Sequence, residues 1–500
     1  MSTPLHISRP PRDKSISSPL AVFGQRLALV GFILYAAFAP HSIAGAEISL
    51  VFVGAGWLLR TIASRQPGTR RTKLDLPIWC FFAWTVASSL LSEEPGISLR
   101  KLQSVCVLFL FYLTQAIVTR RAAFLLVCVM ILSGVAGTLN SLFDVLRGRG
   151  VVVESIADDS PLQQMHVAPG DAIWRINERR IHSLAELDRA IQDAPAGSNL
   201  TVSLISRGEH VERRGLVPAG EVKNRESPSG ITGSHRAHRF RASGWTRHYE
   251  TFAETLQILA LLALGLALAH LKNHGPNLRF KLAITASSLL GVGIALTAMR
   301  TVLVAFGIGV CVIVLRASRG KELVLVPAAL ILVLALGAFV VWQTRAPEAL
   351  ALGDASSSLR LAVARAGAHR ITQHPVFGHG MDAVHRHWSE WGFPGTEMIG
   401  LHSTPLQLAF DRGLPGLALW LWLIATFWLL TTRGERAARE RTDTDTHGIL
   451  LGATGALAAF LASSLVNYNF GDGEVALVFW WLMGIVVVLF ETQQPRQARD

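Results

Sequence analysis

A histidine and several arginines in the second half of the chain are suited to handling an anionic substrate. His402 lies in the stretch Leu401-His402-Ser403-Thr404-Pro405, at the start of an apolar run. Imidazole titrates near neutral pH, so this side chain can serve as a general base. Guanidinium groups offer a planar fork of donors that fits phosphate oxygens and keeps its charge. The arginines expected at the same membrane edge are Arg241, Arg247, Arg300 and Arg360.

Each of these residues also has an ordinary explanation. An arginine at a helix end often anchors the helix at the membrane interface, and a histidine at a helix start often caps or packs. An arginine near the hydrocarbon core costs a few kcal/mol, depending on its depth. A ligand with an anionic head and a lipid tail would offset that cost. A sugar linked to polyprenyl diphosphate is such a ligand.

The composition indicates a membrane protein. The chain has 500 residues, of which 50% are apolar and only 16% are charged. Soluble domains carry about a quarter charged residues. The apolar residues gather in runs of about twenty, which is the length of a membrane-spanning helix. The net charge of +12 does not indicate nucleic-acid binding, because the basic residues form short clusters between the apolar runs.

We expect a polytopic α-helical membrane protein with about twelve transmembrane helices. The expected spans are 24–42, 45–62, 75–92, 101–119, 122–140, 251–271, 281–298, 301–317, 322–342, 405–430, 448–466 and 474–491. With this layout the basic clusters near 9–14, 60–73, 120–121, 272–281, 316–321, 433–441 and 496–499 share one side, which the positive-inside rule makes cytoplasmic. Arg100 and Lys101 are the main exception.

Two long segments face the outer side in this layout. The expected organisation is five helices in 1–140, a small α+β domain in 141–216, a linker in 217–250, four helices in 251–342, a helical outer loop in 343–404, three helices in 405–491 and a cytoplasmic tail in 492–500. The linker is assigned by its Ser, Gly, Arg and His content, which is poor in apolar residues.

The small domain resembles a PDZ domain of the bacterial envelope-protease type. Strands are expected at Ala172–Ile176 and Leu200–Ile205, and Ser183 with Glu186 predicts a capped helix over 184–191. Further matching positions are Val151–Val153, Ser160-Pro161, Ala168–Ile173, Pro195–Gly197 and Arg207-Gly208. The resemblance implies binding of an extended peptide at a sheet edge, or a docking module without a peptide ligand. The carboxylate-binding loop is expected before Val151, where Arg147-Gly148-Arg149-Gly150 is not diagnostic of one.

Residues 240–490 resemble the O-antigen ligase and polymerase superfamily of bacterial envelopes. His402-Ser403 is followed by nine residues, Gly413, two residues and Gly416, as in the ligase signature. The run Pro375-Val376-Phe377-Gly378-His379-Gly380 is similar to the Pro-x-x-Gly-x-Gly pattern of this superfamily. Arg300 stands at a helix start, as in the family. The aromatic residue often found after the arginine at 360 is missing, which makes Arg365 an alternative.

The resemblance implies a metal-independent, inverting glycosyl transfer without a cofactor, at the periplasmic face of the bacterial inner membrane. The donor would be an undecaprenyl-diphosphate-linked glycan, and the acceptor lipid A-core or a protein. The catalytic residues would be His402, Arg300 and Arg360. The substrate-binding residues would be Arg241, His248, Arg365, Ser403 and Gln407.

Other functions remain as alternatives. A polymerase of the same superfamily would use the same residues, and a non-catalytic PDZ scaffold would use none of them. An intramembrane protease would need an HExxH or buried serine motif, which the sequence lacks. Asp443-Thr444-Asp445 is expected to be a solvated cytoplasmic loop. The histidines 374, 379, 385 and 387 fit no common zinc spacing and are expected to be loop residues.

Overall fold

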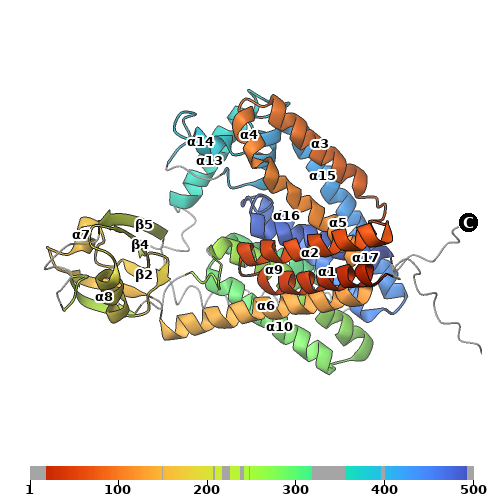
Figure 1. Ribbon diagram of the computed structural model, residues 1–500, viewed down its shortest axis with the longest axis horizontal. Helices are drawn as coiled ribbons and strands as arrows, with labels where there is room; N and C mark the ends of the chain where they lie inside the picture. The colour runs from red at the N-terminus through yellow and green to blue at the C-terminus, as the bar shows by residue number, and fades with distance from the viewer. Residues whose placement is uncertain are drawn as a thin grey trace, which may run out of the picture. The chain divides into compact units, whose positions relative to one another are not determined.

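The computed structural model describes residues 18–148, 150–206, 209–216, 226–236, 241–246, 248–317, 355–395 and 400–491. These residues form two compact units (Figure 1). The helical unit comprises residues up to 137, 243–295 and residues from 299 onward. The sheet unit comprises residues 138–242 with 296–298.

Helices make up almost all of the helical unit. In chain order they are α1 (Pro19–Phe38), α2 (Ile43–Ser64), α3 (Asp75–Leu91), α4 (Pro95–Lys101), the 3-10 helix η1 (Leu102–Leu108), α5 (Phe109–Ile117), α6 (Arg120–Arg147), α9 (Tyr249–His274), α10 (Leu278–Thr297), α11 (Arg300–Ala317), α13 (Ala355–Ile371), α14 (Ala383–Arg386), α15 (Thr404–Glu440), α16 (Thr444–Ser464) and α17 (Gly473–Glu491). Helices α6 and α10 continue into the sheet unit.

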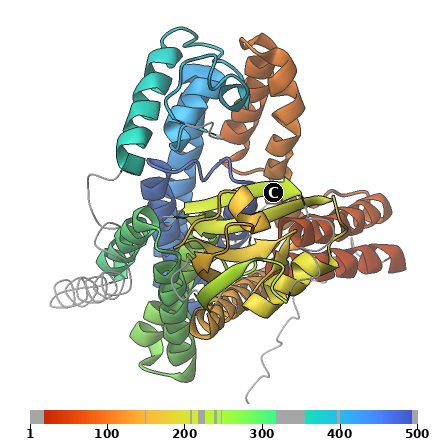
Figure 2. The same ribbon diagram turned by 90° about the vertical axis from the view of Figure 1, so that its left-hand side faces the viewer.

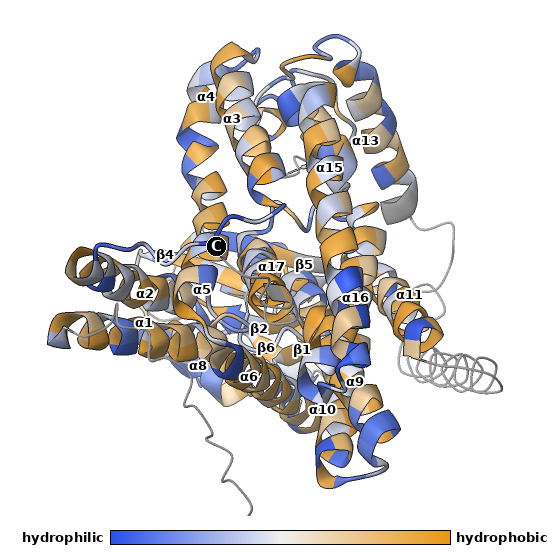
Figure 3. Ribbon diagram, turned by 90° about the vertical axis from the view of Figure 1, so that its right-hand side faces the viewer, coloured by the Kyte–Doolittle hydropathy of each residue, from blue (hydrophilic) through white to orange (hydrophobic). Residues whose placement is uncertain are grey.

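The lengths and composition of these helices confirm a multi-pass membrane protein. Ten helical stretches among the described residues are long and apolar enough to cross a membrane, and Asp75–Leu91 is a shorter apolar helix. Figure 3 shows hydrophobic residues along the helices and hydrophilic ones in the turn between α9 and α10. The expected span at 101–119 begins earlier, at Pro95, as α4, η1 and α5 in succession. The expected span at 322–342 lies outside the described residues.

Close backbone packing builds the centre of the helical unit. Helix α16 packs against α9 and α11. A Cβ atom added to Gly265 of α9 would lie 2.3 Å from the backbone nitrogen of Gly452 in α16, so only glycine allows this approach. Small residues are the usual means by which membrane helices come close, because lipid provides no hydrophobic drive for helix association.

The sheet unit contains a six-stranded antiparallel sheet (Figure 2). Its elements are β1 (Val151–Ile156), α7 (Pro161–Gln164), β2 (Ala172–Ile176), β3 (Arg179–Arg180), α8 (Leu184–Asp193), β4 (Asn199–Ser206), β5 (Glu209–Leu216) and β6 (Ile231–Arg236). The strand order is β5-β4-β2-β1-β6, with β3 paired to β2. The predicted strands and helix are confirmed. The side chain of Ser183 caps α8 by accepting from the Glu186 amide at 3.3 Å.

The expected linker is wrong in one respect, because strand β6 lies within it. β6 pairs antiparallel with β1, and Ile231 is buried in the core of the sheet unit. The Ser229 amide donates to Asp188 of α8 at 2.9 Å, which fixes the turn before β6. Composition missed this strand because its stability comes from pairing with β1, about eighty residues earlier in the chain. β6 is therefore an edge strand of the sheet.

Candidate active site at the start of α15

His402 lies at the entrance of α15 in a conformation that few residues other than glycine adopt. Its φ is +53°, and Ser403 begins the helix with its hydroxyl accepting from the Leu406 amide at 3.5 Å. Burial, together with the positive charge of Arg360, lowers the pKa of His402 from 6.5 to about 4. The imidazole is therefore neutral at pH 7.

The pKa effect also shows that two predicted site residues come together. Arg360 lies on α13, near enough for its charge to act on His402, and is half-buried. Arg365 lies on the same helix, about 140° around the axis from Arg360, and is exposed. Gly367 of α13 packs against Leu401, where an added Cβ would lie 2.8 Å from the leucine side chain. This contact places α13 against the residue that precedes His402.

Gln407 holds the backbone in front of α15. Its side-chain oxygen accepts from the Leu401 amide at 2.7 Å, and its nitrogen donates to Asp411 at 2.7 Å. The side chain is buried, so both ends of the amide are used inside the protein. Gln407, which is predicted from the sequence to bind substrate, thus holds in place the backbone next to His402.

A buried polar network links the start of α15 to the start of α11. Asn467 donates to Glu254 of α9 at 2.9 Å and to Thr301 at 3.3 Å. The Asn467 carbonyl accepts from the amide and the hydroxyl of Thr404, both at 3.1 Å. Ser463 donates a further hydrogen bond to Glu254 at 2.9 Å. Thr301 follows Arg300 directly, so the network fixes the helix starts that carry Arg300 and His402.

Glu254 and Asn467 are not among the site residues predicted from the sequence, although the position of Glu254 could have indicated it. Glu254 is an ionisable residue inside an otherwise apolar span, and such residues are costly enough to indicate a function or a partner. It is 1% exposed. Its partners Ser463 and Asn467 are more than two hundred residues away in the chain, so the network itself could not be predicted.

The remaining predicted residues have different positions. Arg300 is the first residue of α11 and is exposed. His248 precedes α9 and is exposed. Arg241 belongs to the sheet unit.

The glycine-containing loop 375–380 packs against the segment of α15 that contains Gly413. Helix α15 is broken at Gly413, whose φ and ψ are 73° and 174°. The amide of His379 donates to Phe410, and that of Leu414 to Pro375, both at 2.8 Å. A Cβ added to Gly413 would lie 1.9 Å from the Val376 carbonyl. The loop 375–380 thus fills the break, and glycine is required for this close approach.

Glu93, His374 and His379 form the one group with potential metal ligands found among the described residues. Their ligand atoms lie within 4.8 Å of one another. Burial raises the pKa of Glu93, but the hydrogen bond and charge of His379, with His374 and Arg370, outweigh burial and leave that pKa below its usual value. The histidines come from the outer loop and the glutamate from the turn between α3 and α4.

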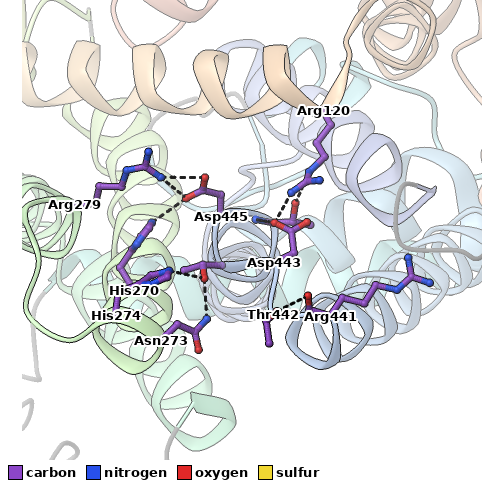
Figure 4. Close-up of polar contacts among 11 residues, drawn as sticks. Arg120, His270, Asn273, His274, Arg279, Arg441, Thr442, Asp443 and Asp445 are labelled. Atoms are coloured by element: carbon purple, nitrogen blue, oxygen red, sulfur yellow. Dashed lines mark hydrogen bonds and ion pairs between the residues drawn. The ribbon is translucent and has the colours of Figure 1, made fainter. Parts of the chain in front are cut away.

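A second polar cluster lies at the opposite end of α15 from His402 (Figure 4). Asp445 accepts from His270 at 2.9 Å and pairs with Arg279 at 3.3 Å, and Asp443 pairs with Arg120. These residues line a cavity of about 430 Å³ together with Arg441. The segment Asp443-Thr444-Asp445, which is expected to be a solvated loop, instead forms ion pairs with residues of other helices. Three predicted cytoplasmic basic clusters meet here.

The fold and site define a multi-pass membrane protein with a basic, histidine-containing polar site at helix starts. Comparison with known families gives two matches. Residues 285–421 match the family described as O-Antigen ligase, and residues 96–213 match the family described as PDZ domain. The chain thus contains an O-antigen ligase domain, of the membrane glycan ligase and polymerase type, together with a PDZ domain. No curated protein matches the chain.

The matched ranges fit the structure in different ways. The ligase match contains Arg300, Arg360, His402 and both glycine motifs. The PDZ match begins well before β1 and ends before β6. The O-antigen ligase match is the one that bears on function, because Arg300, Arg360 and His402 all fall inside it.

Proposed function

We propose that the protein transfers a glycan from undecaprenyl diphosphate to an acceptor hydroxyl at the periplasmic face of the inner membrane. The observation that carries this proposal is the position of His402 at the start of α15, beside the helix α13 that bears Arg360 and inside the matched ligase domain. The lowered pKa of His402 agrees with this position. A base beside a phosphate-binding cation is the combination that such a transfer needs.

His402 acts as the base for the acceptor. A nitrogen of the neutral imidazole takes the proton of the acceptor hydroxyl while the hydroxyl oxygen attacks the anomeric carbon. Attack occurs on the side opposite the diphosphate, so the configuration inverts and the bond to the diphosphate oxygen breaks. Because diphosphate is a good leaving group, little assistance is required at the attacking oxygen, and no metal is needed.

Arg360 and Arg300 act on the leaving group. Their guanidinium groups hold the diphosphate and stabilise the charge that develops on it as the bond breaks. One such contact is worth about two to three powers of ten in rate, by analogy with oxyanion-hole donors. A bound diphosphate also neutralises Arg360, which removes part of the effect that lowers the pKa of His402. Donor binding therefore makes His402 a stronger base.

The other predicted residues have supporting roles. Ser403 and Gln407 fix the backbone on either side of His402 through the hydrogen bonds of the helix start. Arg365 and His248 are exposed and are candidates for contacts to the outer part of the donor.

The sheet unit supplies the site for a peptide partner. β6 is at one end of the strand order, with β1 as its only partner among the described strands. An extended peptide can add to its free edge through backbone hydrogen bonds. The turn at Ser227–Gly230 directly precedes β6, which is the position that a carboxylate-binding loop would have for a peptide at this edge. In the sequence, that loop is expected before β1 instead. Such a peptide would recruit an acceptor protein.

Two acceptors fit this chemistry, lipid A-core and a protein hydroxyl, and an O-antigen polymerase would use the growing glycan itself. A strain lacking the gene distinguishes them, because its envelope lipids and proteins can be analysed for the molecule that loses its glycan. Shortened glycans on an otherwise normal acceptor would favour a polymerase. No change in any glycan would favour the non-catalytic scaffold and contradict the proposal.

A further inference from the structure

The cluster of Glu93, His374 and His379 has an unusual arrangement of acceptors. The Nε2 atom of His379 lies 2.9 Å from the backbone oxygen of Arg370. A carbonyl oxygen only accepts hydrogen bonds, so Nε2 carries the hydrogen. The other nitrogen, Nδ1, needs a proton of its own or a bound cation wherever it faces a group that only accepts. This Nδ1 atom contacts the carboxylate of Glu93, which also only accepts.

A second imidazole faces the same carboxylate. The Nε2 atom of His374 lies 3.8 Å from the same Glu93 oxygen that His379 contacts. The two imidazole rings are 4.8 Å apart. A positive charge, carried by protons on the imidazoles or by a metal ion, must stand between these nitrogens and the carboxylate. One proton can serve only one of the nitrogens, whereas a divalent ion serves all three ligands.

We propose that Glu93, His374 and His379 bind a divalent transition-metal ion of the zinc type. Two imidazoles and a carboxylate are ligands that zinc accepts, and the fourth position of a tetrahedral site is left to water. Ligands of a tetrahedral zinc ion lie about 3.4 Å apart. The 3.8 Å contact of Glu93 with His374 is close to this value, whereas its contact with His379 must widen. The Glu93 side chain is about one-third exposed, at 32%, so it can turn to do so.

The surroundings of His379 match those of a metal ligand. Metal-binding histidines usually donate their other ring nitrogen to a backbone carbonyl or carboxylate, which fixes the tautomer. The Arg370 carbonyl has that role here. The ring is fully buried and stacks on Phe410 at 4.5 Å, so its orientation is fixed before any ion binds.

The ion would fasten the outer loop to the turn between α3 and α4. Two backbone hydrogen bonds already join these segments, from Glu93 to Gly378 at 3.4 Å and from Glu94 to His379 at 3.1 Å. Phe410, on which His379 packs, is eight residues beyond His402, about 12 Å along a helix axis. The ion thus has no place in the proposed transfer step, and its site stands or falls independently of that step.

The test uses the full-length protein in detergent, purified without a histidine tag and stripped with a chelator. The apoprotein is titrated with Zn²⁺, bound metal is counted by mass spectrometry, and Co²⁺ reports the coordination by its visible spectrum. We expect one equivalent of tightly bound zinc and a higher melting temperature with zinc. Glu93→Gln and His374→Ala should each weaken binding at least tenfold. These variants should fold, because both side chains are partly exposed.

His369→Ala is the matched control, since His369 is an exposed histidine on α13 outside the cluster. It should bind zinc like the wild type. The proposal is overturned if the wild type retains no more zinc than Glu93→Gln, or if His369→Ala weakens binding as much as His374→Ala. Transfer activity is measured separately, so loss of transfer with normal zinc binding would count against the proposed function alone.

Discussion

The helical unit and the sheet unit are stabilised in different ways. In the sheet unit, a core rich in Val, Ile and Leu side chains lies beneath an antiparallel sheet, and its elements other than β6 follow local patterns. In the helical unit, buried polar groups join helices that are far apart in the chain, as Glu254 and Asn467 do. Buried polar groups require partners, so positions in the helical unit are strongly constrained. We infer that chemistry depends on the helical unit and that the sheet unit is an added module.

The largest effect is expected at His402. Replacement by alanine should reduce glycan transfer by about a hundredfold or more, because the base is lost, a contribution typically worth two to four powers of ten. Membrane insertion and the melting temperature should be almost unchanged, since the side chain is only half-buried. Transfer is measured with purified protein and a lipid-linked donor. Normal transfer by this variant would remove His402 from the mechanism, and His369→Ala is the control.

Arg360 should affect both the rate and its pH dependence. Arg360→Ala should lower transfer by about a hundredfold through loss of a charge contact, and Arg360→Lys should rescue poorly because the fork is missing. Burial and Arg360 lower the pKa of His402 to about 4, so the wild-type rate should fall only as the pH approaches 4. Removing the positive charge raises this pKa, so the acidic limb should move to higher pH. An unmoved limb in the profile of kcat/KM would contradict the pairing.

Gly413 tests the break in α15. Gly413→Ala places a Cβ 1.9 Å from the Val376 carbonyl at a φ of 73°. We expect destabilisation of about 1–3 kcal/mol, as for other strained positions, and a lower melting temperature in detergent. Gly54→Ala is the matched control, because its Cβ would meet nothing within 4 Å. Equal melting temperatures for both variants would mean that loop 375–380 does not occupy the break.

The smallest effect on basal transfer is expected from the sheet unit. Residues 150–236 should be removed together, since deletion of 150–216 alone would leave β6 and the apolar Ile231 without β1. A short Gly-Ser linker should replace them. We expect measurable basal transfer, within about tenfold of the wild type at saturating acceptor. Complete loss in a correctly inserted protein would show that the unit takes part in the reaction itself.

Features that depend on neighbouring residues could be predicted from the sequence alone. Apolar runs of about twenty residues predicted the spanning helices, and Ser183 with Glu186 predicted the start of α8, because caps act within one helical turn. The spacing of His402, Gly413 and Gly416 indicated the ligase resemblance, which the family match over 285–421 bears out.

Contacts between residues that are distant in the chain became visible only in the folded protein. Composition assigned β6 to a linker, because pairing with β1 is not visible in local sequence. The spacing of the histidines predicts no zinc site, whereas Glu93 approaches His379 from nearly three hundred residues away in the chain. The effect of the Arg360 charge on the pKa of His402 likewise depends on how α13 packs against Leu401. Such contacts arise when helices bury their surfaces against one another, and no local periodicity encodes them.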